Sequence, residues 1–125
     1  MAMAWEQGEL FPSADKSDVD RTRILLEEYS TMVDIVDGLK EREVRSAAEE
    51  KLLREWEPAI HNIVLAIEAI KNREIRDIMK YRFLNFYPRK AAVVKWHSFS
   101  ERSLDRKILE GIGMVASTLK MLGIM

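Results

Sequence analysis

The sequence predicts an all-α protein in which N-terminal amphipathic helices are followed by three further helices. Apolar residues recur at spacings of three and four over most of the chain, and residues that favour helix N-termini precede several of these stretches. No stretch shows the alternation of a strand over a useful length. The chain has 125 residues, 47% hydrophobic and 33% charged. It is therefore long enough for one domain with a single core, with or without an arm.

Residues 1–16 form the predicted N-terminal arm. Gly8 and Pro12 interrupt any periodic pattern in this segment. Trp5, Leu10 and Phe11 are nevertheless apolar, so we expect part of the arm to dock on the rest of the chain rather than to extend freely.

Residues 17–70 are predicted to form an acidic helical region. Its first helix is expected to start at Ser17, which together with Asp20 resembles a capping pair. The helical spacing places Asp18 mainly outside the apolar stripe of this helix. The stripe consists of Leu25, Leu26, Tyr29, Met32, Val33, Val36 and Leu39.

A second helix is predicted to begin at Ser46, because Ser46 and Glu49 fit a capping box in which each side chain satisfies the other residue's free backbone N–H. Pro58 follows within the same pattern. Because proline lacks an N–H and clashes inside a helix, it is expected to kink this segment or to open a new helix. The strong stripe that follows predicts a buried helix face, formed by Ile60, Ile63, Val64, Ile67 and Ile70.

Three helices are predicted beyond residue 70. Asn72 can cap the first of them, which is expected over about residues 73–84. A turn that includes Pro88 then leads to a short helix over about residues 88–96.

The last helix is predicted to start at Ser100, a good N-cap, after a second tight turn. Glu101 is favourably placed at the positive end of this helix. Gly111 and Gly113 are expected to bend it. Its inward face is expected to consist of Leu104, Ile108, Ile112 and Val115.

Charge is divided unevenly along the chain, although the formal net charge is only −1. Residues 1–70 carry 8 Lys or Arg and 16 Asp or Glu, a net charge of −8. Residues 71–125 carry 12 Lys or Arg and 5 Asp or Glu, a net charge of +7. The basic part is therefore expected to face a polyanion.

The last two predicted helices are separated by a tight turn, which is the order that a tri-helical DNA reader requires. We therefore predict that residues 71–125 form a basic helix-turn-helix DNA-binding domain behind the N-terminal amphipathic helices. The helix that starts at Ser100 is expected to read the major groove. The residues expected to contact bases are Ser100, Arg102, Ser103, Arg106 and Lys107. The residues expected to contact phosphates are Arg82, Arg89, Lys90 and Lys95.

Residues 69–84 (AIKNREIRDIMKYRFL) and 99–106 (FSERSLDR) carry the most motif-like detail in the chain. These segments look like the fourth region of sigma factors, and they more closely resemble the ArpU family of phage late-gene transcriptional regulators. The early ELFP at residues 9–12 is also similar to ArpU-type N-termini. The resemblance implies a sigma-like tri-helical DNA-binding domain in a regulator of phage or prophage packaging or lysis genes.

The sequence offers little support for catalysis or for a metal site. The chain has no cysteine, which excludes a disulfide scaffold, a cysteine nucleophile and thiolate zinc ligands. The two histidines, His61 and His97, lack a ligand spacing, and no glycine-rich phosphate loop or nucleophile motif is present. We therefore expect no enzyme activity, no cofactor and no metal.

The sequence also predicts a cytoplasmic protein without a membrane partner. No basic stretch followed by an apolar run marks a signal peptide near the start. The longest apolar tract, residues 111–125, is too short to span a bilayer and contains Lys120.

Double-stranded DNA is the first expected partner, for a sequence-specific transcription regulator. The alternative class is a helical protein-interaction module that binds RNA polymerase. The stripes of residues 25–39 and 60–70 could equally form a homo-oligomer. A third alternative is a small phage DNA-packaging protein.

Overall fold

The computed structural model describes residues 14–124, and all regular structure within them is helical. The all-α prediction is therefore confirmed for this part of the chain. The expectation that the arm docks depends on Trp5, Leu10 and Phe11, which lie outside the described residues. The elements are α1 (Lys16–Glu41), α2 (Ala47–Glu68), α3 (Arg73–Met79), the π-helical turn η2 (Lys80–Leu84), α4 (Arg89–Lys95) and α5 (Glu101–Met121).

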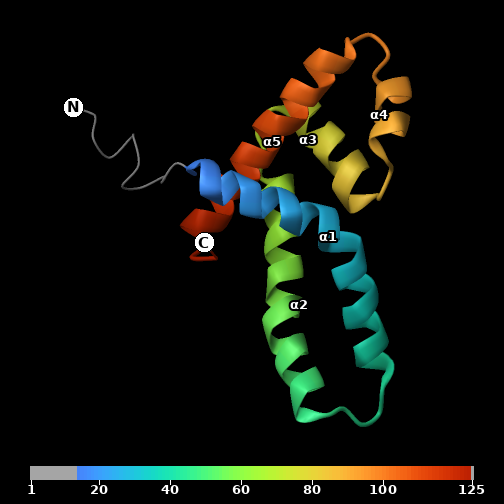
Figure 1. Ribbon diagram of the computed structural model, residues 1–125, viewed down its shortest axis with the longest axis vertical. Helices are drawn as coiled ribbons and strands as arrows, with labels where there is room; N and C mark the ends of the chain where they lie inside the picture. Colours follow the sequence, from blue (N-terminus) through green and yellow to red (C-terminus); the bar gives the residue numbers. More distant parts are fainter. Residues whose placement is uncertain (1–13, 125) are drawn as a thin grey trace, which may run out of the picture.

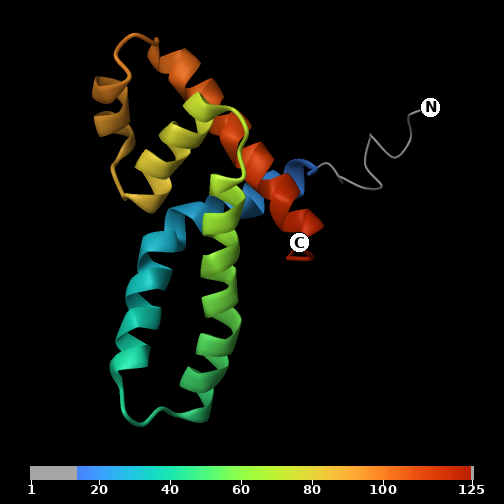
Figure 2. The same ribbon diagram turned by 180° about the vertical axis from the view of Figure 1, so that it is seen from behind.

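The helices form two parts (Figure 1). One is the projecting hairpin of α1 and α2, and the other is the group of α3, α4 and α5. The second half of α1 runs antiparallel to α2, and the loop at residues 42–46 closes the far end of this hairpin (Figure 2). The first half of α1 takes a different direction and crosses α5. The loop between α4 and α5 lies at the opposite end of the molecule from the hairpin loop. The start of α5 is thus far from the hairpin tip.

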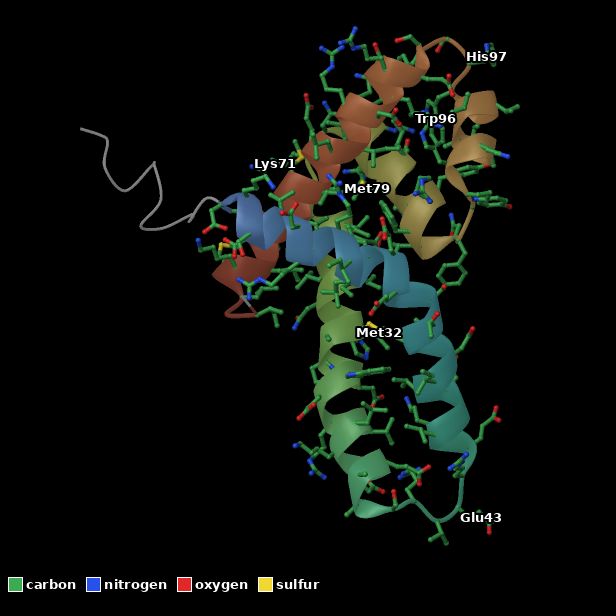
Figure 3. The ribbon with its side chains drawn as sticks, in the orientation of Figure 1. Met32, Glu43, Lys71, Met79, Trp96 and His97 are labelled. Carbon is green, nitrogen blue, oxygen red and sulfur yellow. The ribbon has the colours of Figure 1, made fainter. Side chains whose placement is uncertain are left out.

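The main hydrophobic core is shared by all the helices. It joins residues of α1 such as Leu26 and residues of α2 such as Ile67 to Ile78 of α3, Ala92 of α4 and Leu104 of α5. Figure 3 shows another member, Met79, between α3 and α5. The change from acidic to basic sequence near residue 70 therefore does not divide the hydrophobic core.

A second, smaller cluster holds the hairpin together beyond the main core. It contains Val36 and Leu39 of α1 and Leu53 of α2, and the partly buried Trp56 packs against it. Met32 is buried nearer the main core and lies between α1 and α2 (Figure 3). The end of the predicted stripe thus packs against α2, whereas Leu26 and Tyr29 belong to the main core.

The start of α1 differs from the predicted Ser17 cap. Asp15 is the N-cap, and Asp15 and Asp18 form a reciprocal capping box. The sequence predicted that Asp18 would lie mainly outside the apolar face. In the structure this residue is buried, and only 4% of it is exposed. Its carboxylate lies 3.1 Å from Arg21 and 3.1 Å from Lys120 near the end of α5. The prediction for Asp18 was wrong because its burial depends on the approach of α5 to α1, which helical spacing does not reveal.

Asp18 is expected to make the stability of the chain fall in acid. The Asp15 N–H donates to its carboxylate, and this bond and Lys120 hold the pKa of Asp18 below its ordinary value of 3.8. A lowered folded-state pKa stabilises the fold above the ordinary value and loses that contribution as pH falls below it. We expect Asp18→Asn to flatten the fall in unfolding free energy below about pH 4, measured by urea denaturation.

The control for this prediction is Asp20→Asn, because Asp20 pairs with the exposed Lys16 at the surface of the same helix. An exposed pair contributes little to stability. If the unfolding free energy of Asp18→Asn depended on pH in the same way as that of the wild type and of this control, Asp18 would not be the source of the acid sensitivity.

The structure bears on two further expectations for helix interiors. α2 continues through Pro58 as one helix, so Pro58 does not open a new helix. Side chains on both sides of the proline, Trp56 and Ile60, pack against the hairpin cluster and hold the helix across it. α5 likewise continues through Gly111 and Gly113 as one helix.

Gly111 is required by packing rather than by a bend. A Cβ at this position would lie 2.6 Å from both Cγ and Sδ of Met79, and 3.1 Å from Cγ2 of Ile75. The absence of a side chain lets α3 lie close against α5. A Cβ at Gly113 would meet nothing within 4 Å, so that glycine has no such role.

Candidate nucleic-acid interface

The turn before α5 is closed by its own aromatic residues. α4 ends at Lys95, and the Phe99 N–H donates to the Trp96 carbonyl at 3.0 Å. The Trp96 ring is partly buried and meets Tyr81 edge-on, with 5.2 Å between ring centroids. His97 is exposed and points outward from the turn (Figure 3). Trp96 thus fills the turn and anchors it to η2.

Ser100 and Ser103 start α5. The Ser100 hydroxyl accepts from the Ser103 N–H at 3.1 Å and also bonds the Ser103 hydroxyl at 3.1 Å. The predicted cap at Ser100 is therefore confirmed. Both hydroxyls, which we expected to contact bases, are engaged in this cap, and their direct effect in the structure is to fix the first turn of α5.

Arg102 and Arg106 lie on the outer face of α5. The predicted inward residues Leu104, Ile108, Ile112 and Val115 are all buried. Arg102 and Arg106 are four residues apart, so they share the opposite face of the helix. Both are exposed, and neither has an ion pair or hydrogen bond within residues 14–124. These two guanidinium groups are therefore available to an external partner.

Arg89, an expected phosphate contact, binds acidic residues of the same chain. Its Nε and Nη2 donate to the two carboxylate oxygens of Asp105 at 2.8 and 2.9 Å. Its Nη1 lies 3.5 Å from Glu101. The Arg89 guanidinium holds the pKa of Asp105 below its usual range. This two-bond contact ties the start of α4 to the first two turns of α5.

The contact of Arg89 with Asp105 is expected to contribute little to stability, because both side chains are about half exposed. We expect Arg89→Ala to lower the unfolding free energy only slightly in urea denaturation, because solvent screens the pair. Lys90→Ala, the matched control, should leave it unchanged, because Lys90 has no ion pair within residues 14–124. A larger loss for Lys90→Ala than for Arg89→Ala would contradict the assignment.

Lys107 and Lys95 are also engaged within the chain. Lys107 Nζ lies 2.7 Å from Glu74 of α3 and 5.0 Å from the centroid of the Phe99 ring. Lys95 Nζ lies 5.4 Å from the Tyr81 ring centroid and 5.5 Å from that of Trp96. Both ammonium groups therefore help to hold the helices around the turn.

Arg82 lies in the middle of η2, next to Tyr81. Its Nη1 donates to the Tyr87 carbonyl at 3.1 Å, and its guanidinium lies 4.7 Å from the Phe83 ring centroid. Burial lowers the pKa of Arg82. Its Nε is buried and has no hydrogen-bond acceptor in the described chain. Arg82 is thus engaged by the backbone and by an aromatic ring of its own segment.

The structure sorts the predicted site into free and engaged side chains. Arg102, Arg106 and Lys90 are exposed and have no ion pair with another residue between 14 and 124. The other six predicted residues cap a helix, pair with acids or pack on aromatic rings. The sequence reasoning missed the acidic partners of Arg89 and Lys107, because no local pattern links residues 16 or 33 positions apart.

Comparisons with known proteins identify no relative of this chain. No protein-family model, no curated protein and no solved structure matches it. Among the described helices, none has the length and apolar character needed to cross a bilayer.

Proposed function

We propose that this chain is a DNA-binding transcription regulator that places the first turns of α5 in the major groove. The observation that carries the proposal is the pair Arg102 and Arg106, which extend unpaired from the outer face at the start of a capped helix. An arginine fork can bind two acceptors on guanine, which makes it the commonest base-specific contact. Recognition helices present their N-terminal residues to base edges in this way.

The short helix α4 would lie across the DNA backbone, as the first helix of a helix-turn-helix does. Lys90 is exposed in its first turn and is free to neutralise a phosphate. Arg89 would act indirectly, by holding α4 against α5 through Asp105. Trp96 would keep the turn closed, since its ring packs on Tyr81.

The net charge of +7 over residues 71–125 supports the same partner, because a basic segment attracts the polyanionic backbone. The resemblance of residues 69–84 and 99–106 to ArpU-type regulators supports a role in transcription. The same resemblance suggests that the regulated genes are the late genes of a phage or prophage, which serve packaging and lysis. Fragments from the chain's own genomic neighbourhood are therefore the first DNA to test.

The proposal is tested by titrating the full chain into a labelled duplex of about 20 base pairs, two helical turns, at several salt concentrations. Fluorescence anisotropy should show binding whose logarithm falls linearly with the logarithm of salt concentration. At least one neighbourhood fragment should bind more tightly than a scrambled duplex of the same length. Negligible binding of every duplex at low salt would contradict the proposal.

A further inference from the structure

A hollow of about 180 Å³ opens where α1 meets the segment that joins η2 to α4. Aromatic side chains form much of its wall, and three polar side chains complete it. The aromatic residues are Phe83, Phe86 and Tyr87, and the polar residues are Glu27, Ser30 and Arg82. A cavity of about 150 Å³ can hold a benzene ring. This hollow is therefore large enough for one planar ring.

Tyr87 presents an aromatic surface to this hollow. One face of its ring is stacked on Tyr81, with 4.2 Å between centroids and 9° between planes. The Tyr87 side chain is still 47% exposed and lines the hollow. Tyr81 is itself supported edge-on by Trp96. The Tyr87 ring is thus supported by Tyr81 on one face, and the residue stays accessible at the hollow.

The backbone before Tyr87 holds the neighbouring Phe86 in an exposed position. Phe86 has φ 65°, a left-handed conformation that is uncommon for a bulky residue and occurs mostly where the surroundings enforce it. Two hydrogen bonds of Tyr87 fix this geometry: its N–H donates to Tyr81 at 3.2 Å, and its carbonyl accepts from Arg82 at 3.1 Å. Phe86 remains 51% exposed. The segment therefore displays two adjacent rings.

The polar side chains around the hollow include both hydrogen-bond donors and an acceptor. Arg82 lines the hollow with its guanidinium-bearing side chain, which carries N–H donors. Glu27 supplies a carboxylate. Pro88 also lines the hollow, and two residues later Lys90 is exposed without an ion pair in residues 14–124. These donors, the acceptor and the nearby cation match a ligand of one kind. It is a planar ring that carries donors and acceptors on its edge and is attached to a phosphate.

We propose that the hollow binds one unpaired nucleobase, which stacks on Tyr87 while Lys90 contacts the adjoining phosphate. The identification of the polymer as DNA rests on the proposed function. Bases of any type can stack on an aromatic ring, so the site would be tolerant of sequence. It would give the chain a base contact separate from the base contacts of α5, with Lys90 as the phosphate contact common to both.

The test compares two single strands of equal charge, about 10 nucleotides long: oligothymidylate and an abasic strand with the same phosphates. Anisotropy of the labelled strands is measured with the full chain. We expect the abasic strand to bind about 10-fold more weakly, because it cannot stack. Tyr87→Ala should remove this difference, and Tyr87→Phe, which keeps the ring, should preserve it. Duplex affinity should be unchanged in Tyr87→Phe, which keeps the ring that stacks on Tyr81.

Equal affinity of the wild type for the two strands would overturn the proposal, and this comparison needs no variant to fold. A base-dependent difference that survives Tyr87→Ala in a folded variant would also overturn it. Duplex binding that persists in either case would leave the helix-turn-helix proposal standing. Conversely, base-dependent binding of single strands without any duplex binding would overturn the proposed function and support this site.

Discussion

Replacing Arg102 and Arg106 together with alanine is expected to weaken duplex binding at least about 30-fold. An arginine that meets a base contributes about 1–3 kcal/mol, and two such contacts therefore account for at least about 2 kcal/mol. Both side chains are exposed and neither has an ion pair or hydrogen bond within residues 14–124, so the fold should be unaffected. Anisotropy at fixed salt measures the affinity, and the preference for the best fragment over a scrambled duplex should shrink with it.

The matched control is the double variant Lys51→Ala and Arg54→Ala, which removes the same charge from α2. Lys51 and Arg54 are exposed, and neither has an ion pair within the described chain. They lie near the start of α2, the end of that helix that adjoins the hairpin loop and is remote from the start of α5 (Figure 1). Equal loss of affinity in the two double variants would show that net charge alone drives binding, and would contradict a reading role for α5.

Gly111→Ala is expected to destabilise the fold by about 1–3 kcal/mol, the usual cost of overpacking. The added methyl group would lie 2.6 Å from Met79, which is fully buried and has little room to move. This cost should exceed the gain of about 0.5–1 kcal/mol that alanine brings to a helix interior in place of glycine. Urea denaturation measures the change in unfolding free energy.

Gly113→Ala provides the control two residues along the same helix. Its Cβ would meet nothing within 4 Å, so the helix propensity alone should act and stabilise the chain by about 0.5–1 kcal/mol. The two substitutions should therefore have opposite signs. A Gly111→Ala variant as stable as Gly113→Ala would show that α3 and α5 do not approach each other so closely.

Local chemistry accounts for the parts of the fold that the sequence predicted well. The caps at Ser46, Asn72 and Ser100 depend on side chains within three residues of each helix start, and all three form as expected. The inward face of α5 follows from the helical repeat, and Leu104 and Ile108 are buried. Spacing along one helix is sufficient for such features.

Features that depend on two elements were not predictable from spacing. Asp18 is buried because Lys120 of α5 approaches α1, and Gly111 is required because Met79 of α3 lies against it. Neither partner is marked in the sequence near the residue it affects. The continuous helix through Pro58 likewise depends on packing against the hairpin cluster.

The same distinction holds for the candidate site. The sequence identified basic residues around α4 and α5, and composition alone was enough for that. It could not show that Arg89 pairs with Asp105 or that Lys107 pairs with Glu74, since these pairs form only when helices pack. The structure narrows nine expected contacts to the free cations Arg102, Arg106 and Lys90 in α4 and α5.

The most direct test of the account is an NMR titration of the isotope-labelled full chain with the best-binding duplex. Backbone amide shifts should change first at Arg102, Ser103 and Arg106, and then around Lys90. Amides near the hairpin tip, residues 42–56, should not move. Shifts confined to the hairpin, or no shifts at the start of α5 while DNA is bound, would contradict the assignment of α5 as the DNA-reading helix.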